Sequence, residues 1–203
     1  MDSSVIVAFI SGVVGPVLLL LIKHQFDKSK QSNDIIKDAL AVSECVESKL
    51  DAIKEDYKAD RVWITQFHNG GHFYPTGKSI AKFTMLYEVV EVDTASNQSN
   101  FQNIPVNLFS KSINRLLSND VIEIYDFKDK ETPTYGLEHI AIENNTKSVY
   151  LFAIKNIDGK FVGILGLDYT KKKTKLTPND IIHLQVSGTL LGGVLMTHLC
   201  QNS

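Results

Sequence analysis

The sequence is poor in cysteine, tryptophan and proline, with two, one and five residues of these types among 203. The two cysteines, Cys45 and Cys200, lie far apart and form no C-x-x-C pair or metal-binding spacing. We therefore expect free thiols. This favours a reducing compartment only weakly, because two cysteines suffice for one disulfide.

The sequence also lacks an excess of charge of either sign. Its formal net charge is -2, and Lys and Arg are scattered among Asp and Glu. Without a basic face or an acidic tail, we predict no nucleic-acid partner. The length and apolar content allow one domain of ordinary size plus an extra element.

Sequence motifs of catalysis are missing as well. No G-x-S-x-G elbow, Walker motif or dinucleotide glycine pattern follows an expected strand. Gly163 and Gly166 stand inside an expected strand, where glycine admits a neighbouring side chain more readily than a phosphate. We predict that the protein is not an enzyme, and the sequence leaves any cofactor unknown.

One long uncharged run stands at the start of the chain. Residues 3–22, SSVIVAFISGVVGPVLLLLI, are enough for a helix to cross a bilayer core of roughly 30 Å. The alternative is a cleaved signal peptide, but no Lys or Arg precedes the run and no A-x-A-like site follows it. We predict a single-pass anchor over residues 1–24, in an inner or plasma membrane.

The charges that flank this run predict its orientation. Only Asp2 and the amino terminus precede it, whereas Lys23, Lys28 and Lys30 follow it, offset by Asp27. The positive-inside rule therefore places the rest of the chain in the cytoplasm, by a small margin.

A linker and a helical stalk are expected over residues 25–59. Ser32 is suited to be the N-cap of the stalk helix. Spacings of three and four then alternate in a heptad seam formed by Ile36, Ala39, Ser43, Val46, Leu50, Ile53 and Tyr57. The partner of this seam is either a second copy of the helix in a homodimer or the sheet of the domain that follows.

Residues 60–203 predict a globular α+β domain. Strands are expected at 61–67, 81–92, 121–125, 148–154 and 161–169, and helices at 106–117, 135–143 and 177–199. In the second strand, Phe83, Met85, Tyr87 and Val89 are expected on one face. Asp158-Gly159 predicts a tight hairpin, and Thr177 with Pro178 and Asp180 predicts a helix start with a capping box.

This order of elements resembles that of the GAF family of small-molecule-sensing domains, from Ser32 to Leu199. The most characteristic piece is SVYLFAIKNIDGKFVGILGLDY, residues 148–169, which is similar to the GAF hairpin before the last helix. The resemblance implies an antiparallel sheet of five to six strands flanked by helices. It further implies that the first and last helices pack on one sheet face and often form a dimer contact, while loops on the other face enclose a ligand pocket.

The resemblance does not identify a ligand. The chain lacks the asparagine-lysine-phenylalanine-aspartate-glutamate signature of the members that bind cyclic nucleotides. Neither Cys45 nor Cys200 stands where a tetrapyrrole-attaching cysteine would. The implied function is a membrane-anchored sensory, scaffold or interaction domain that dimerises through its helices and takes a small-molecule ligand.

A second resemblance rests on layout alone. One membrane span, a polar helical stalk and one α+β domain of this size are also the layout of the holins of T-even-like phages. That alternative implies a lysis protein with its domain in the periplasm, which conflicts with the predicted cytoplasmic side.

Candidate pocket residues come from loop position and side-chain type near the expected ligand face. They are Gln66, His68, His72, Tyr74, Lys78, Tyr135 and His139. His68 and His72 flank Asn69-Gly70-Gly71, but no Asp, Glu or Cys nearby completes a metal site, so no metal is predicted. Glu88 and Asp168 stand on strands with apolar neighbours, where each faces solvent, a paired cation or a pocket, and solvent is the commonest of these.

Overall fold

Six antiparallel strands form one sheet in the order β3-β2-β1-β6-β5-β4. The computed structural model describes residues 35–201, so the expected membrane span and the N-cap at Ser32 lie outside the described residues. Within residues 35–201, no helix is both long and apolar enough to span a membrane.

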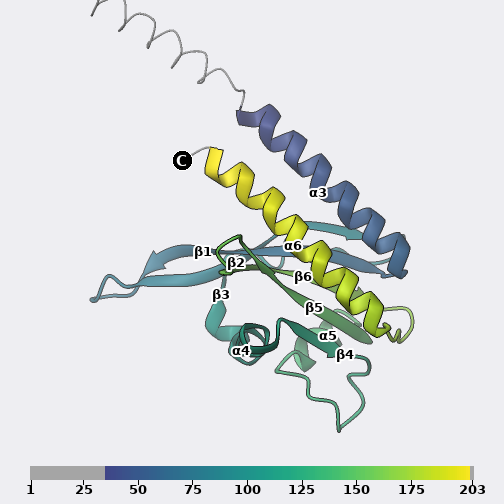
Figure 1. The fold of residues 1–203 in the computed structure, drawn as a ribbon. Coiled ribbons are helices and arrows are strands. Elements are labelled where there is room, and N and C mark those ends of the chain that lie inside the picture. The colour runs from purple at the N-terminus through teal and green to yellow at the C-terminus, as the bar shows by residue number, and fades with distance from the viewer. Residues whose placement is uncertain (1–34, 202–203) are drawn as a thin grey trace, which may run out of the picture. The chain divides into compact units, whose positions relative to one another are not determined.

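The elements follow the chain in the order expected from the sequence (Figure 1). They are α3 (Ile35–Tyr57), β1 (Arg61–His72), β2 (Ser79–Val90), β3 (Ile104–Pro105), the 3-10 helix η2 (Val106–Phe109), α4 (Ser110–Asn119), β4 (Val121–Ile124), α5 (Glu138–Glu143), β5 (Ser148–Lys155), β6 (Phe161–Tyr169) and α6 (Pro178–Gln201). The predicted α+β class and the antiparallel sheet flanked by helices are confirmed. The two-residue strand β3, which pairs with Lys82 and Phe83 at the end of the sheet, has no predicted counterpart.

The two compact units of the chain divide within α3, between Leu40 and Ala41. From Val42 onward, the heptad seam of α3 packs on the sheet of its own domain, with Val46, Leu50 and Ile53 buried in the larger core. Of the two partners that the sequence allowed, the sheet is therefore the one that this part of the seam contacts.

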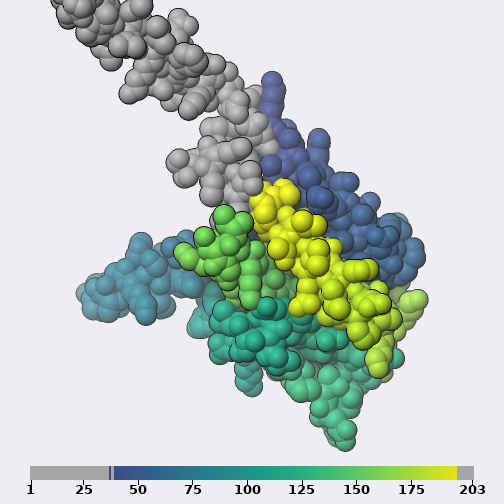
Figure 2. Space-filling view, in the orientation of Figure 1, coloured from purple at the N-terminus to yellow at the C-terminus, as the bar shows by residue number. Residues whose placement is uncertain are grey.

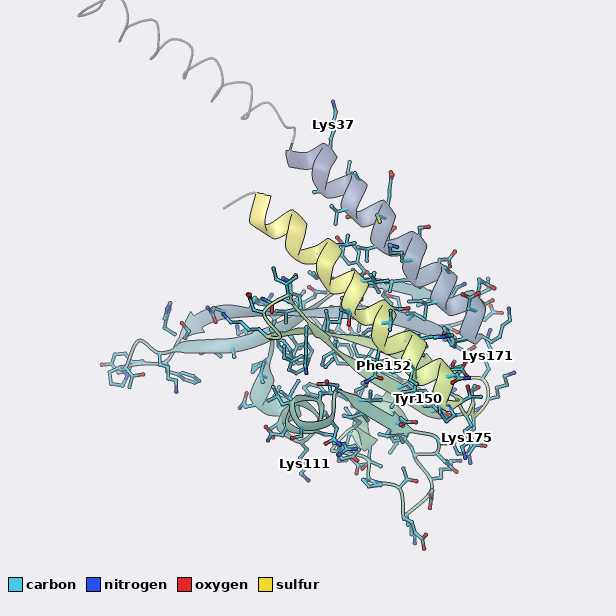
Figure 3. The ribbon with its side chains drawn as sticks, viewed as in Figure 1. Lys37, Lys111, Tyr150, Phe152, Lys171 and Lys175 are labelled. Carbon is cyan, nitrogen blue, oxygen red and sulfur yellow. The ribbon has the colours of Figure 1, made fainter. Side chains whose placement is uncertain are left out.

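The larger core lies between the sheet and the helices α3 and α6, which share one sheet face (Figure 1). Tyr150 and Phe152 lie on β5 beneath α6 (Figure 3) and are almost completely buried. The hydroxyl of Tyr150 donates to the carbonyl of Thr174 and accepts from the N–H of Leu176, so β5 also fixes the loop that leads into α6. The smaller core lies on the opposite sheet face, against α4 and the loop before α5.

The capping box predicted at the start of α6 is present. Asp180 accepts hydrogen bonds from the N–H and the hydroxyl of Thr177, and the N–H of Asp180 donates to the Thr177 hydroxyl. These hydrogen bonds lower the pKa of Asp180, the bond from the Thr177 N–H most of all. The reciprocal bonds satisfy two N–H groups that the first turn of a helix leaves without partners.

The predicted facing of β2 is wrong, because a β-bulge interrupts the strand. Ile64 pairs with Tyr87 but the next residue of β1 pairs with Met85, so Leu86 is an extra residue on β2. Phe83 and Met85 therefore face the smaller core, whereas Tyr87 packs against the larger one. The side-chain amide of Gln98 donates to the carbonyl of Leu86, which satisfies the bulged residue.

Candidate functional site

A cavity of about 80 Å³ lies on the sheet face opposite α3 and α6, between the sheet and α4, α5 and the loop after β2. This is the face on which the GAF resemblance implies a pocket. Its apolar and aromatic lining consists of Trp63, Phe83, Met85, Phe101, Phe109, Ile113, Phe127, Leu137, Ile140, Ala141, Val149, Leu151 and Ile164. Its polar lining consists of Thr65, Asn97, Ser112, Asn144, Thr146 and Asp168.

The floor of the cavity comes from two central strands, β1 and β6. Their antiparallel register places Arg61, Trp63 and Thr65 opposite Asp168, Gly166 and Ile164. A side chain on Gly166 would overlap the indole ring of Trp63, so the glycine provides the space in which the indole lies. The prediction that this glycine admits a neighbouring side chain is confirmed.

A buried ionic cluster lies at the Asp168 end of these strands. The guanidinium of Arg61, which is 1% exposed, donates from Nη1 to Asp168 Oδ2 at 2.7 Å and from Nη2 to the carbonyl of Ala95 at 3.0 Å. Its Nε lies 3.4 Å from Glu88 Oε1, which is an ion-pair contact rather than a hydrogen bond. The indole Nε1 of Trp63 donates to the same Asp168 oxygen at 3.3 Å. Of the three environments that the sequence leaves open for Glu88 and Asp168, both have the paired cation, because both contact Arg61, and the preference for solvent is wrong.

Glu88 also fixes the loop after β2 over the cavity. Its carboxylate accepts hydrogen bonds from the backbone N–H groups of Asn97 and Gln98, at 2.9–3.0 Å, and from the hydroxyl of Ser96. Asn97 is buried and lines the cavity. The ionic cluster thus joins β1, β2, β6 and this loop into one side of the cavity.

The electrostatics of the cluster are unbalanced. Two carboxylates, Glu88 and Asp168, contact one guanidinium, so the three groups sum to one negative charge when all are ionised. Burial raises the pKa of Asp168, although the charge of Arg61 and the hydrogen bonds from Arg61 and Trp63 act in the opposite direction. The carboxyl group is held where its charged form is costly unless a positive partner is close.

Thr65 contributes a second polar group to the cavity. It is 2% exposed, and its hydroxyl has no hydrogen-bond partner among the described residues. A buried hydroxyl without a partner costs free energy, so this position favours a polar atom from a bound molecule.

None of the seven residues predicted for the pocket lines this cavity. The strand β1 continues to His72, because His68, Asn69 and His72 pair with the start of β2. Residues 68–72, which follow the expected strand 61–67, are therefore part of the strand. His72, Tyr74 and Lys78 lie at the exposed end of the β1–β2 hairpin, which projects from the domain (Figure 2). Their role in binding stays a prediction.

The other four predicted residues lie apart from that hairpin end. His68 is half-buried, with Nε2 at 2.9 Å from the hydroxyl of Thr84, and Gln66 is half-buried on β1. The guanidinium carbon of Arg115 lies over the ring of Tyr135, 5.6 Å from the ring centre. Tyr135 also packs against the smaller core. His139 is exposed on α5. Among residues 35–201, no three His, Cys, Asp or Glu side chains are placed to hold a metal ion.

The sequence reasoning missed Arg61, Trp63, Thr65 and Asn97 as cavity or cluster residues. One signal was available: Arg61, Glu88 and Asp168 are charged residues within or at the end of otherwise apolar strands, and buried charges occur in pairs. The register that brings Arg61 opposite Asp168 depends on long-range pairing, which a single sequence does not specify.

We predict that replacing Arg61 by methionine lowers the free energy of unfolding by about 3–5 kcal/mol, because two buried carboxylates lose their cation. Chemical denaturation of the full-length chain measures this loss. The matched control is Lys155→Met, which removes a half-exposed ion pair of the same 2.7 Å length with Asp120 and costs less than about 1 kcal/mol. Equal losses in the two variants would contradict a special role of Arg61.

Comparisons with known proteins show the fold. A scan of the sequence against protein-family models found no match, and a search of curated proteins found none either. Solved structures do match: a far-red cyanobacteriochrome photoreceptor is 16% identical, with a TM-score of 0.61 over 90% of this chain and 98% of its own. The GAF domain region of a proposed membrane protein from Geobacter sulfurreducens PCA is 12% identical, with a TM-score of 0.61 over 81% of this chain and 99% of its own.

A domain of a proposed two-component sensor histidine kinase from Sinorhizobium meliloti 1021 is also similar. It is 15% identical, with a TM-score of 0.51 over 75% of this chain and 89% of its own. At these identities the likeness concerns the fold. The described part of this chain has a GAF fold, with a six-stranded antiparallel sheet flanked by helices.

Proposed function

We propose that this protein is a non-catalytic, membrane-anchored sensory module that binds a small molecule in the cavity on the sheet face opposite α3 and α6. The observation that carries the proposal is the cavity itself. Apolar and aromatic side chains line most of it, and a few buried polar groups converge on it, as in ordinary small-molecule sites. The GAF fold shared with a photoreceptor and a sensor-kinase domain supports a sensory role by analogy.

The size of the cavity narrows the class of ligand. At roughly 10–15 Å³ for each water-sized group, about 80 Å³ corresponds to about five to eight such groups. This is the scale of a molecule of one ring with a short chain. A tetrapyrrole is much larger than that. Cys45 supports the same conclusion, because it is exposed on α3, and α3 packs on the other face of the sheet.

The cavity predicts that a one-ring neutral probe, benzyl alcohol, raises the melting temperature of the full-length chain in a concentration-dependent way, because it binds the folded state only. Ala141→Leu places a larger side chain in the cavity lining and removes this effect. Differential scanning calorimetry measures both. The control Ala52→Leu, at an exposed position of α3, keeps the effect.

The same measurement tests two of the seven residues predicted from the sequence, His68 and His72. If the double variant His68→Ala, His72→Ala removes the benzyl alcohol effect and Ala141→Leu leaves it, the binding site is at the β1–β2 hairpin and the cavity proposal is wrong. Loss in Ala141→Leu alone supports the cavity.

The proposed anchor is residues 3–22, with the domain on the cytoplasmic side. The support is the uncharged run and the Lys residues that follow it. Reporter enzymes fused to the carboxyl terminus, one active only in the cytoplasm and one only in the periplasm, test the topology. We expect activity of the cytoplasmic reporter and no loss of host viability, whereas periplasmic activity with abrupt membrane permeabilisation would favour the holin-like alternative.

A homodimer through α6 is part of the proposal. Ile182, Val186 and Leu190 form a row at spacings of four on α6, and they are 56%, 54% and 62% exposed. Residues 181–201 contain no Asp, Glu, Lys or Arg, so two copies of this face meet without repulsion between like charges. An exposed apolar row of this kind marks an interaction site.

A dimer of this kind predicts that Leu190→Cys, made in a chain in which Cys45 and Cys200 are serine, forms a disulfide-linked dimer on mild oxidation. Residues near a two-fold axis lie close to their own copies, which is the reason for this expectation. Gel electrophoresis without reductant measures the linked fraction. The control Ile157→Cys is fully exposed in the turn between β5 and β6, and equal linking of both variants would contradict the α6 interface.

A further inference from the structure

We propose that the ligand of the cavity is a small amine that carries one positive charge, with its ammonium group at Asp168 and a hydrogen-bonding group at Thr65. This inference rests on the proposed function, because it names the class of molecule that the same cavity takes. Three features of the cavity support it: the charge of the cluster, the oxygen of Asp168 that neither Arg61 nor Trp63 binds, and the distance between the two polar positions.

The charge of the cluster calls for one more cation. Arg61 contacts both Glu88 and Asp168, which leaves one negative charge in excess when both carboxylates are ionised. Glu88 has its own donors, the backbone N–H groups of Asn97 and Gln98 and the hydroxyl of Ser96. The excess therefore concerns Asp168, which is the carboxylate that lines the cavity.

The orientation of Asp168 leaves one oxygen for a bound molecule. In the part of the chain that the structure describes, two side-chain donors reach it, Arg61 Nη1 and Trp63 Nε1, and both bind Oδ2. Neither of them reaches Oδ1. An ammonium group is a donor without an acceptor, so it can bind Oδ1 without competing with Arg61.

The aromatic lining suits the same chemistry. Trp63 lines the cavity next to Asp168. Phe109 meets Phe83 edge to face, with ring centres 5.3 Å apart, and meets Phe101 at a tilt, with ring centres 6.4 Å apart. Rings of this kind pack well against an apolar body, and a ring face attracts a cation. An anion would meet the excess negative charge of the cluster and is disfavoured.

The second polar position fixes the length of the ligand. Asp168 pairs with Arg61, and Thr65 is four residues further along β1, which is about 13 Å at roughly 3.3 Å per residue. Both side chains line the cavity. A hydrogen bond of about 2.8 Å at each end takes up part of the separation, so the ligand itself spans roughly 7–8 Å. A ring with an amine on a short chain at one end and a hydroxyl at the other spans such a gap, and the hydroxyl gives the buried Thr65 oxygen the partner that it lacks.

The experiment compares three one-ring probes on the full-length chain. Tyramine carries the ammonium and the phenol hydroxyl, 4-(2-hydroxyethyl)phenol replaces the ammonium by a neutral hydroxyl, and 2-phenylethylamine lacks the phenol hydroxyl. The chain has a single tryptophan, so one indole N–H resonance reports binding next to Asp168. We expect tyramine to shift this resonance with a Kd about tenfold lower than that of the neutral analogue, because hydrogen bonds to charged groups are stronger.

Two variants assign the preference to its residues. Asp168→Asn keeps an acceptor for Trp63 but removes the charge, and it abolishes the advantage of tyramine over its neutral analogue. Thr65→Val keeps the shape of the side chain, and it abolishes the advantage of tyramine over 2-phenylethylamine. If Asp168→Asn does not fold, the comparison of tyramine with the neutral analogue on the wild-type chain still decides the charge preference.

The outcomes separate the two proposals. Equal Kd values for tyramine and its neutral analogue would overturn the amine inference and leave the cavity as a ligand site. A tyramine preference that survives in Asp168→Asn would also overturn it. If benzyl alcohol and all three of these probes leave the indole resonance and the melting temperature unchanged, the proposed function itself is wrong.

Discussion

The structure depends most on one buried cation, the guanidinium of Arg61 at the start of β1. It contacts Asp168 on β6, Glu88 on β2 and the carbonyl of Ala95 in the following loop, so it ties three strands and a loop to one point. Burying these charges is costly unless each has its partner. These charge pairs therefore favour one register of β1 against its neighbours. That register sets the shape of the cavity at the end near Asp168.

The two faces of the sheet have different roles in the domain. One face packs against α3 and α6 through a continuous apolar core. Shorter helices and a long loop cover the other face, and they enclose the cavity against it. The bulge at Leu86 serves this division, because it turns Phe83 and Met85 toward the cavity while Tyr87 remains with the helices. The strand β1 supports both layers, because Val62 and Ile64 pack in the larger core while Trp63 and Phe67 pack against the smaller one.

The elements and their order could be predicted from local patterns, since Asp158-Gly159 specifies a hairpin and Thr177 to Asp180 specifies a helix start. The sheet face that carries the cavity could be inferred from the GAF resemblance. The cavity residues could not, because Trp63, Asn97 and Asp168 meet only through pairing of β1 with β6 and folding of a loop over β2. The histidines near Gly70 were predicted as site residues because of their side-chain type. The pairing of β1 with β2 extends their segment into a hairpin, which lies away from the cavity.

The position of a bound molecule is the most direct test of the claim that the cavity is a binding site. Isotope-filtered nuclear Overhauser measurements between unlabelled tyramine and the labelled full-length chain detect close pairs of protons. If tyramine binds in the cavity, we expect contacts to the methyl groups of Ile113 and Ile164, which line it. We expect no contacts to the methyl groups of Ile154 and Leu184, which lie in the larger core with the long helices. Contacts at the second pair, or contacts confined to the β1–β2 hairpin, would contradict the claim.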